Sequence, residues 1–355
     1  MTLRDRIIRR IRLDGPLRLS DYMADCLLHP TLGYYTTRDP FGAAGDFITA
    51  PEISQMFGEL IGLCLAQSWL DQGGPSPFTL AELGPGRGTL MADVLRATRA
   101  VPGFHAAAQI YLIEASPKLR AKQAETLANH TPHWLDDATA LPDQPLFIIA
   151  NEFFDALPIR QFQRDGQGWR ERVVGLEGDS LTLGLTGPAP QPLLTHRLAD
   201  TKDGDLVEIC TPATPVITAL AGRIARHGGA GLIVDYGDWR SLGDTLQALR
   251  AHETVDILAD PGQADLTAHV DFEALAGVAR ANGCAHSRLT TQGVFLERLG
   301  ITARAQTLAK GQSDQMRADI TSAHRRLTQA GEMGNLFKVL GLTPPAAPPI
   351  PGLAP

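Results

Sequence analysis

The sequence predicts an α/β fold in which helices cover a largely parallel sheet. The first observation is an alternation of apolar, strand-like runs and helical segments between residues 78 and 150, which is typical of successive strand–helix–strand units. The second is the turn after the first strand, where Gly84, Gly86 and Gly88 occupy every second position. The third is the return of the same alternation at residues 215–234, after a segment of different composition.

Composition restricts the class of protein. The chain has 355 residues, of which 44% are hydrophobic, enough for a sizeable core. Its 32 basic and 39 acidic residues give a net charge of −7, so no overall positive field attracts nucleic acid or an anionic membrane. The four cysteines contain no Cys-x-x-Cys pair, which argues against a zinc ribbon, a redox dithiol or a disulfide scaffold. We therefore expect a globular protein that binds neither nucleic acid nor metal.

Stable insertion into a membrane is not expected. The longest apolar run, Leu60–Ala66, is far shorter than the roughly 20 residues that span a bilayer. The first thirteen residues combine arginines with apolar residues, as transit peptides and membrane-surface helices do. A first helix that packs Ile7 and Ile11 inward explains this pattern more simply. The expected location is cytoplasmic, and homodimer formation is left open.

Residues 1–75 are expected to form a helical N-terminal region that serves as a lid or contacts a substrate. Helices are predicted from Thr2 onward, at Ser20–Leu28 with Ser20 as N-cap, and at Pro51–Leu70. The loop between the last two is rich in glycine, aromatic and acidic residues, as substrate-facing loops often are. Its candidate substrate contacts are Tyr34, Asp46 and Glu52, although a plain surface loop explains the composition equally well.

Residues 76–342 are expected to form the sheet-containing domain. Its core elements are predicted to be strand Phe78–Leu83, helix Thr89–Arg99, strand Gln109–Glu114, helix Pro117–Ala128, a short strand near His133–Leu135, strand Pro145–Ala150, helix Pro215–His227, strand Ala230–Val234, helix Phe272–Asn282, and a last strand pair near Ala285–Leu289 and Leu336–Leu340.

Two insertions and a tail interrupt or follow this series. Alternating residues at about 160–192 predict an antiparallel hairpin after the fourth strand. A second insertion, at about 241–270, is punctuated by glycine and aspartate. Residues 343–355 contain six prolines and are expected to form an extended, poorly ordered tail.

The glycine turn predicts a nucleoside-containing ligand. Glycines allow positive φ and a close approach of the backbone, and the following helix offers unpaired N–H groups. The dinucleotide fingerprint requires its third glycine at position 89, which is Thr89. Glu114, at the end of the second strand, can accept hydrogen bonds from ribose hydroxyls. Asp137, just past the third strand, can face an adenine amino group, although a turn-forming aspartate is an equal alternative.

Two acids after the strand at 147–150 are candidate catalytic residues. The strand runs into Asn151, Glu152 and Phe153, and ligands of open α/β sheets bind beyond the carboxyl ends of strands. Because arginine stays protonated in water, nucleophilic use of its nitrogen requires carboxylates that orient the group and accept its proton. Glu152 and Asp155 suit this role, while capping of a helix N-terminus is the structural alternative.

Four segments in order are similar to the MidA-like family of class I S-adenosylmethionine-dependent methyltransferases. They lie at residues 45–54, 82–89, 151–158 and 262–267, and the resemblance covers nearly the whole chain. The family includes a mitochondrial protein arginine methyltransferase needed for assembly of respiratory complex I. The resemblance therefore implies a Rossmann-like methyltransferase sheet and methylation of an arginine in a complex I subunit.

The resemblance also implies roles for individual residues. Glu82, in the pattern acidic-x-Gly-x-Gly-x-Gly, would hold the methionine amino group of S-adenosyl-L-methionine. The other implied cofactor-binding residues are Gly84, Gly86, Gly88, Glu114, Asp137 and Asn151, and Phe153 is an implied substrate contact. A non-catalytic assembly chaperone that keeps the fold is an alternative function, and an NAD-dependent oxidoreductase is disfavoured by Thr89.

Overall fold

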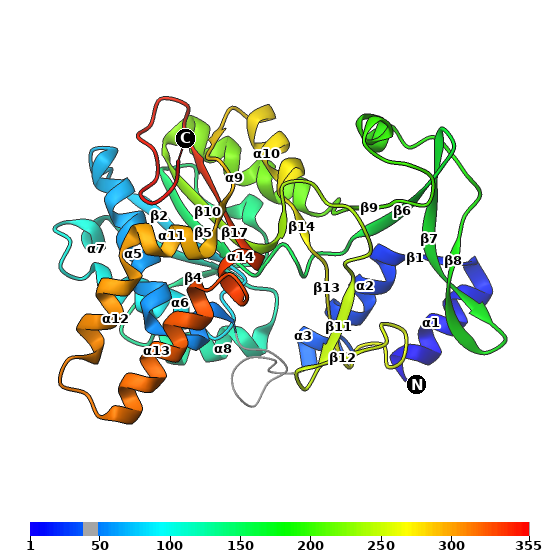
Figure 1. The fold of residues 1–355 in the computed structure, drawn as a ribbon, viewed down its shortest axis with the longest axis horizontal. Coiled ribbons are helices and arrows are strands. Elements are labelled where there is room, and N and C mark those ends of the chain that lie inside the picture. The colour runs from blue at the N-terminus through cyan, green and yellow to red at the C-terminus, as the bar shows by residue number, and fades with distance from the viewer. Residues whose placement is uncertain (38–48, 355) are drawn as a thin grey trace.

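A mostly parallel sheet forms the centre of the computed structural model, which describes residues 1–37 and 49–354 (Figure 1). The strand order is β15-β17-β10-β5-β2-β3-β4. Strands β4, β3, β2, β5 and β10 run parallel, whereas β17 pairs antiparallel with β10. The bounds are β2 Phe78–Leu83, β3 Ala108–Ile113, β4 His133–Leu135, β5 Leu146–Asn151, β10 Gly229–Asp238, β14 Val270–Asp271, β15 Ala285–His286, β16 Thr290–Thr291 and β17 Phe337–Thr343. The predicted α/β class is confirmed.

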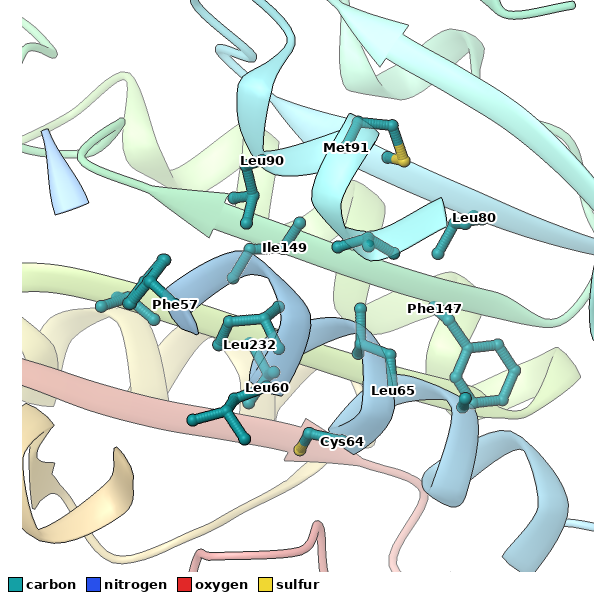
Figure 2. Packing of buried hydrophobic residues seen from close by; sticks show 14 of the residues in the cluster. Phe57, Leu60, Cys64, Leu65, Leu80, Leu90, Met91, Phe147, Ile149 and Leu232 are labelled. Carbon is teal, nitrogen blue, oxygen red and sulfur yellow. The ribbon is translucent and has the colours of Figure 1, made fainter. Parts of the chain in front are cut away.

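Helices cover both faces of this sheet, which explains why its central strands are apolar throughout. On β5, Phe147 packs into one core cluster and the adjacent Ile148 into the other. The first face is covered by α5 (Gln55–Asp71), α6 (Thr89–Thr98) and α11 (Gln292–Leu299), and the second by α9 (Ala213–His227) and α10 (Phe272–Ala281). Figure 2 shows the first cluster, in which side chains of α5 and α6 meet those of β2, β5 and β10. Strands buried on both faces need no polar alternation.

Helices α5 and α6 approach closely because α5 carries two glycines at the contact. A Cβ atom on Gly58 would lie 2.6 Å from the Cβ of Asp93, and one on Gly62 would lie 2.8 Å from the Cα of Val94. Since α6 begins directly after the glycine turn, this contact holds the turn against the core. Helices α7 (Phe104–Ala107) and α8 (Pro117–Thr126) complete the series between β2 and β4.

An antiparallel sheet beside the central one is built from the first insertion and the N-terminal region (Figure 1). Its path is β1-β7-β6-β9, with β8 paired to β7, which confirms the expected antiparallel strands. A third sheet, β12-β11-β13, comes from the second insertion. The bounds are β1 Leu17–Arg18, β6 Arg160–Asp165, β7 Gly168–Glu177, β8 Ser180–Leu185, η2 Pro192–Ala199, β9 Leu206–Ile209, β11 Gln247–Arg250, β12 Glu253–Val255 and β13 Asp265–Thr267.

The N-terminal helices pack on these insertions. Helix α1 (Leu3–Asp14) buries Ile7 and Ile11 as predicted, and its first turn is closed by a capping box between Thr2 and Asp5. Helix α2 (Leu19–Leu28) follows β1 and joins the same cluster. Its N-cap is Arg18, so the assignment of Ser20 is wrong by two residues.

The expected helical region 1–75 is not one unit. The predicted helix Pro51–Leu70 is broken at Ser54, which caps α5 after a short α4 (Ala50–Ile53). Helix α5 belongs to the central core, whereas α1, α2 and α3 (Tyr34–Thr37) pack with the insertions. Among the described residues, no helix is both long and apolar enough to cross a membrane.

Two C-terminal features differ from expectation. Residues 292–335, for which no element was predicted, contribute to α11, α12 (Ile301–Ala309), α13 (Asp314–Thr328) and α14 (Met333–Leu336). The described part of the proline-rich tail is not free, because Ile350 and Leu353 are buried in the first core cluster. The Arg288 amide also donates to the Ala354 carbonyl over 3.0 Å. Proline content alone predicted an extended tail, whereas these apolar side chains decide its packing.

Candidate active site

A cleft of about 720 Å³ lies at the carboxyl ends of the parallel strands. The glycine turn, the loops after β3, β4 and β5, and Tyr236 of β10 form one part of its wall. The rest comes from α2, α3, the second insertion, helix α8, the beginning of α9 and the junction of α14 with β17. Its polar lining residues are Tyr35, Glu114, Asp136, Asp137, Glu152, Asp155, Tyr236, Gln247, Asp265, Thr267 and His269.

The glycine turn adopts the backbone conformation that its sequence predicts. Gly84, Gly86 and Gly88 have φ of 58°, 52° and 81°. The Gly84 amide donates to the Ile113 carbonyl over 3.0 Å, which joins the turn to β3. A Cβ atom on Gly84 would lie 3.0 Å from Cδ2 of Phe153. Any side chain here would therefore strain the backbone and press on the cleft wall.

Glu82 is buried beneath this turn with an unsatisfied oxygen. Its side chain is 3% exposed, and Oε2 has no hydrogen-bond partner among the described residues. Burial raises the pKa of the Glu82 carboxyl to about 8, with a further contribution from Glu114, while a hydrogen bond from the Met91 backbone opposes the rise. Asn151 Oδ1 is likewise buried without a partner. Buried acceptors of this kind fit the ammonium group of an amino acid.

Glu114 is fixed in position by hydrogen bonds. Its Oε1 accepts from the Ser116 amide over 2.8 Å, and its Oε2 accepts from Gln123 Nε2 over 3.1 Å. The same Gln123 nitrogen donates to the Gly86 carbonyl over 2.8 Å. Burial raises the pKa of Glu114. Gln123 thus joins the glycine turn to the acid after β3, and no spacing in the sequence marks it for that role.

The two aspartates after β4 line the cleft with different partners. Asp137 Oδ1 accepts from the Thr139 amide over 2.6 Å and so caps the short helix η1 (Ala138–Ala140). Asp136 pairs with Arg120, which also donates to the Glu114 carbonyl. The hydrogen bond of Asp137 is therefore that of a turn-forming aspartate. Because Asp137 also lines the cleft, a contact with the adenine stays a proposal.

Glu152 has an unusual backbone conformation. Its φ is +50°, which is rare for a residue with a side chain and typical of functional sites. Its Oε1 accepts from the Ala50 amide over 3.0 Å and from Asn151 Nδ2 over 3.1 Å. Burial raises the pKa of Glu152 to about 7, and Asp155 adds to the rise. Residues 152–158 form no helix, so neither acid caps a helix of its own segment, but Glu152 does accept from the first amide of α4, as a helix-capping acid would.

Asp155 lies next to a third carboxylate that was not predicted. Within residues 1–37 and 49–354, Asp155 Oδ1 is buried without a hydrogen-bond partner, and burial raises the pKa of Asp155 to about 6, partly offset by Tyr236. Asp235 lies on β10, and its Oδ2 accepts from the amides of Phe153, Phe154 and Asp155 over 3.0–3.3 Å. The sequence contained a signal for Asp235, because the apolar run 230–234 is followed directly by this acid, much as the run 147–150 is closely followed by Glu152.

The predicted substrate contacts lie in different places. Tyr34 is fully buried and does not line the cleft, whereas its neighbour Tyr35 does. We therefore replace Tyr34 with Tyr35 as the candidate. Glu52 accepts a 2.6 Å hydrogen bond from Thr89 at the start of α6 and does not line the cleft. Phe153 lines it, and Asp46 lies outside the described residues.

Comparisons with known proteins agree on the class of enzyme. Residues 60–290 match Methyltransf_28, a family described as S-adenosyl-L-methionine-dependent methyltransferase. The chain is 37% identical to the mitochondrial protein arginine methyltransferase NDUFAF7 of Danio rerio, covering 93% of this chain and 84% of the relative. It is 35% identical to the Homo sapiens protein of that name, covering 95% and 82%. These relatives are named as mitochondrial, so they lend no support to the expected cytoplasmic location.

A solved structure is similar over nearly the whole chain. It is a COG1565 superfamily protein from Burkholderia thailandensis bound to S-adenosyl-homocysteine, with a TM-score of 0.88, 28% identity and coverage of 99% of this chain and 94% of that one. Such a ligand fits the buried oxygens of Glu82 and Asn151, which have no hydrogen-bond partner among the described residues, and the positive φ of the three glycines. The cofactor is S-adenosyl-L-methionine, and the alternative of an NAD-dependent oxidoreductase is excluded. The chain belongs to the Methyltransf_28, or MidA-like, family of class I S-adenosyl-L-methionine-dependent methyltransferases.

Proposed function

We propose that this enzyme methylates an arginine side chain of a protein. The observation that carries the proposal is a pair of acids, the partly buried Glu152 and the buried Asp155, which line the cleft beside the glycine turn. The names of the relatives, protein arginine methyltransferases, support the same acceptor.

The cofactor supplies an electrophilic methyl group carried on a sulfonium. We assign Glu82 and Asn151 to its amino group, the glycines at 84, 86 and 88 to the close backbone approach, and Glu114 to the ribose hydroxyls. We assign Asp137, which also lines the cleft, to the adenine. No metal is needed for these roles.

Glu152 and Asp155 provide what a guanidinium requires. A guanidinium has N–H donors in a fixed planar fork and loses its proton only when its nitrogen is alkylated. In the part of the chain that the structure describes, Asp155 Oδ1 is an acceptor without a partner, and both bonds to Glu152 use Oε1. Burial raises the pKa of both acids, which makes each a better proton acceptor near neutral pH. Asp235 holds the loop between them through three backbone amides, so their spacing is set before an acceptor binds.

The finer proposal is that the acceptor belongs to a respiratory complex I subunit during assembly, as the family resemblance implies. The test is transfer of isotope-labelled methyl groups from S-adenosyl-L-methionine to purified complex I subunits, followed by mass spectrometry of peptides. Label on an arginine of one subunit is expected, and label on another residue type would reject the arginine acceptor. Unlabelled subunits that nevertheless fail to assemble in a deletion strain would favour the chaperone alternative.

A further inference from the structure

A second cavity, of about 400 Å³, adjoins the active cleft and has no role in the proposed transfer reaction. It lies between the first insertion and α10, and His269 lines both spaces. Neighbouring residues divide between them, since Phe153 lines the cleft and Phe154 the second cavity, and Pro212 and Ala213 divide in the same way. The cleft and the second cavity therefore share a wall.

Apolar side chains form much of the second cavity. They come from the loop after β5, from η2, β9 and α10, and include Phe154, Ile159, Leu194, Val207, Ile209 and Leu275. At the edge of the cavity, Leu193 of η2 is 61% exposed. A large apolar side chain exposed beside a hollow is typical of a surface that contacts a ligand or a partner.

Arg197 of η2 adds a buried guanidinium to this wall. It is 2% exposed, and its Nε donates to both carboxylate oxygens of Asp200 over 3.1 Å. Asp200 is shared, because its Oδ2 also accepts from Arg240 over 3.1 Å. Within the described residues, Nη1 and Nη2 of Arg197 have no hydrogen-bond partner. Since buried N–H groups are normally satisfied, these donors call for an acceptor that enters the cavity.

The carboxylates that line the second cavity already have donors of their own. Asp271 accepts from two backbone amides over 3.0 and 3.1 Å. Glu273 accepts from Arg240 through both oxygens, over 2.5 and 2.6 Å. Oε1 of Glu208 accepts from the Thr245 amide over 3.0 Å, and its Oε2 accepts from the Thr245 hydroxyl. The cavity therefore offers a ligand hydrogen-bond donors from Arg197 and an apolar surface, whereas its acids are engaged.

We propose that the second cavity binds an acidic side chain of the acceptor protein, together with an apolar neighbour, close to the arginine that enters the cleft. The inference rests on the proposed protein acceptor and adds a sequence preference to it. A carboxylate suits the planar guanidinium of Arg197, which binds such a group through parallel N–H donors. The acceptor protein is the source of the carboxylate, because a cavity that shares a wall with the cleft is within reach of the same extended segment.

The test is calorimetric titration of short blocked peptides into the enzyme saturated with S-adenosyl-homocysteine. Each peptide contains one arginine and, at a series of spacings on either side of it, either Glu-Leu or Gln-Leu. Wild type is expected to bind at least one glutamate peptide about tenfold more tightly than its glutamine counterpart, because a hydrogen-bonded carboxylate replaces a neutral amide.

Two variants locate the preference in the second cavity. Arg197→Met removes the donors and leaves Asp200 paired with Arg240, and it should abolish the preference. Gly277→Phe should do the same by filling the cavity, since Gly277 of α10 lines it and a Cβ atom there would meet nothing within 4 Å. Gly175→Phe on β7 is the matched control, because its Cβ also meets open space but Gly175 lines neither the cleft nor the second cavity, and it should bind as wild type does.

Equal binding of glutamate and glutamine peptides by wild type at every spacing overturns the inference, as does an unchanged preference in Arg197→Met or Gly277→Phe. If Arg197→Met does not fold, which loss of S-adenosyl-homocysteine binding reveals, Gly277→Phe decides. Blocked Glu-Leu that binds as tightly as the whole peptide rejects the acceptor protein as the source. A preference that depends on Arg197, in peptides whose arginine is not methylated when S-adenosyl-L-methionine is supplied, contradicts the proposed function and supports the site for an acidic side chain.

Discussion

Glu152→Gln should make the cofactor-free enzyme more stable at pH 8 while it loses activity. Glutamine keeps an oxygen that can accept from the Ala50 amide and Asn151 Nδ2, so the local bonding is preserved. The substitution removes a buried negative charge whose neighbours include Asp155 and Asp235. If Glu152 served the fold alone, this substitution would lower the stability of the enzyme.

The magnitude follows from the pKa of Glu152. Because the folded-state pKa is raised from 4.5 to about 7, the folded enzyme binds the proton more tightly than the unfolded chain. The destabilisation is absent below pH 4.5, grows between pH 4.5 and 7, and is fully present above pH 7. Each tenfold difference in proton affinity is worth about 1.4 kcal/mol, so the upper limit is about 3 kcal/mol. We expect a gain of about 1–3 kcal/mol at pH 8 and little change at pH 4.5.

The assay is urea unfolding of cofactor-free wild type and variant at both pH values, together with single-turnover methylation. Turnover is expected to fall by about 10²–10⁴ if Glu152 positions and deprotonates the acceptor. Glu177→Gln, an exposed acid on β7, is the control and should change neither quantity. A variant that is less stable than wild type at pH 8 and retains near-normal turnover would refute the reasoning.

Three further predictions test other parts of the structure. Gly84→Ala should weaken binding of S-adenosyl-homocysteine at least about tenfold, as measured by calorimetry. The control is Gly178→Ala, because Gly178 has a similar φ of +61° and open space around it; this variant should lose only about 1–2 kcal/mol of stability and bind as wild type does. In wild type, kcat/KM should rise from pH 5.5 to 7.5 and then level off. The reason is that the pKa values of Asp155 and Glu152 are raised to about 6 and about 7, and the protonated acids cannot accept a proton. A profile that is flat over this range would contradict their role as bases. Leu353→Ala should destabilise the fold by about 2–4 kcal/mol in urea unfolding, and a neutral result would mean that the proline-rich segment does not belong to the core.

The cofactor turn and the acids after β5 were accessible from the sequence because each is defined by neighbours along the chain. Glycines at 84, 86 and 88 follow an apolar strand directly, and their positive φ is a local requirement. Glu152 likewise follows its strand at once, and the carboxyl ends of parallel strands meet at one edge of a sheet. Local pattern and general topology together were sufficient here.

The α-helices between residues 292 and 328 were missed for a different reason. Helix α13 is mostly polar and buries Leu327 alone, so it shows little of the apolar periodicity that marks a helix. Helix α12 is held through Arg304, which donates to Glu59 of α5 over 2.7 and 2.9 Å, a pairing across 245 residues. Such contacts have no sequence signature.

The sequence by itself determined the α/β class, the glycine turn and the acids that end its strands, since these depend on side-chain periodicity and on residues within a few positions of each other. Only the tertiary structure decided which polar groups share the cleft. Tyr35 meets Asp265 across 230 residues, and Asp235 meets the Phe154 amide across 81. Tyr34 and Tyr35 are adjacent and chemically identical, yet one is buried and the other faces the cleft. That choice is made by the packing of α3 against the second insertion, because burial and hydrogen bonding depend on neighbours in space.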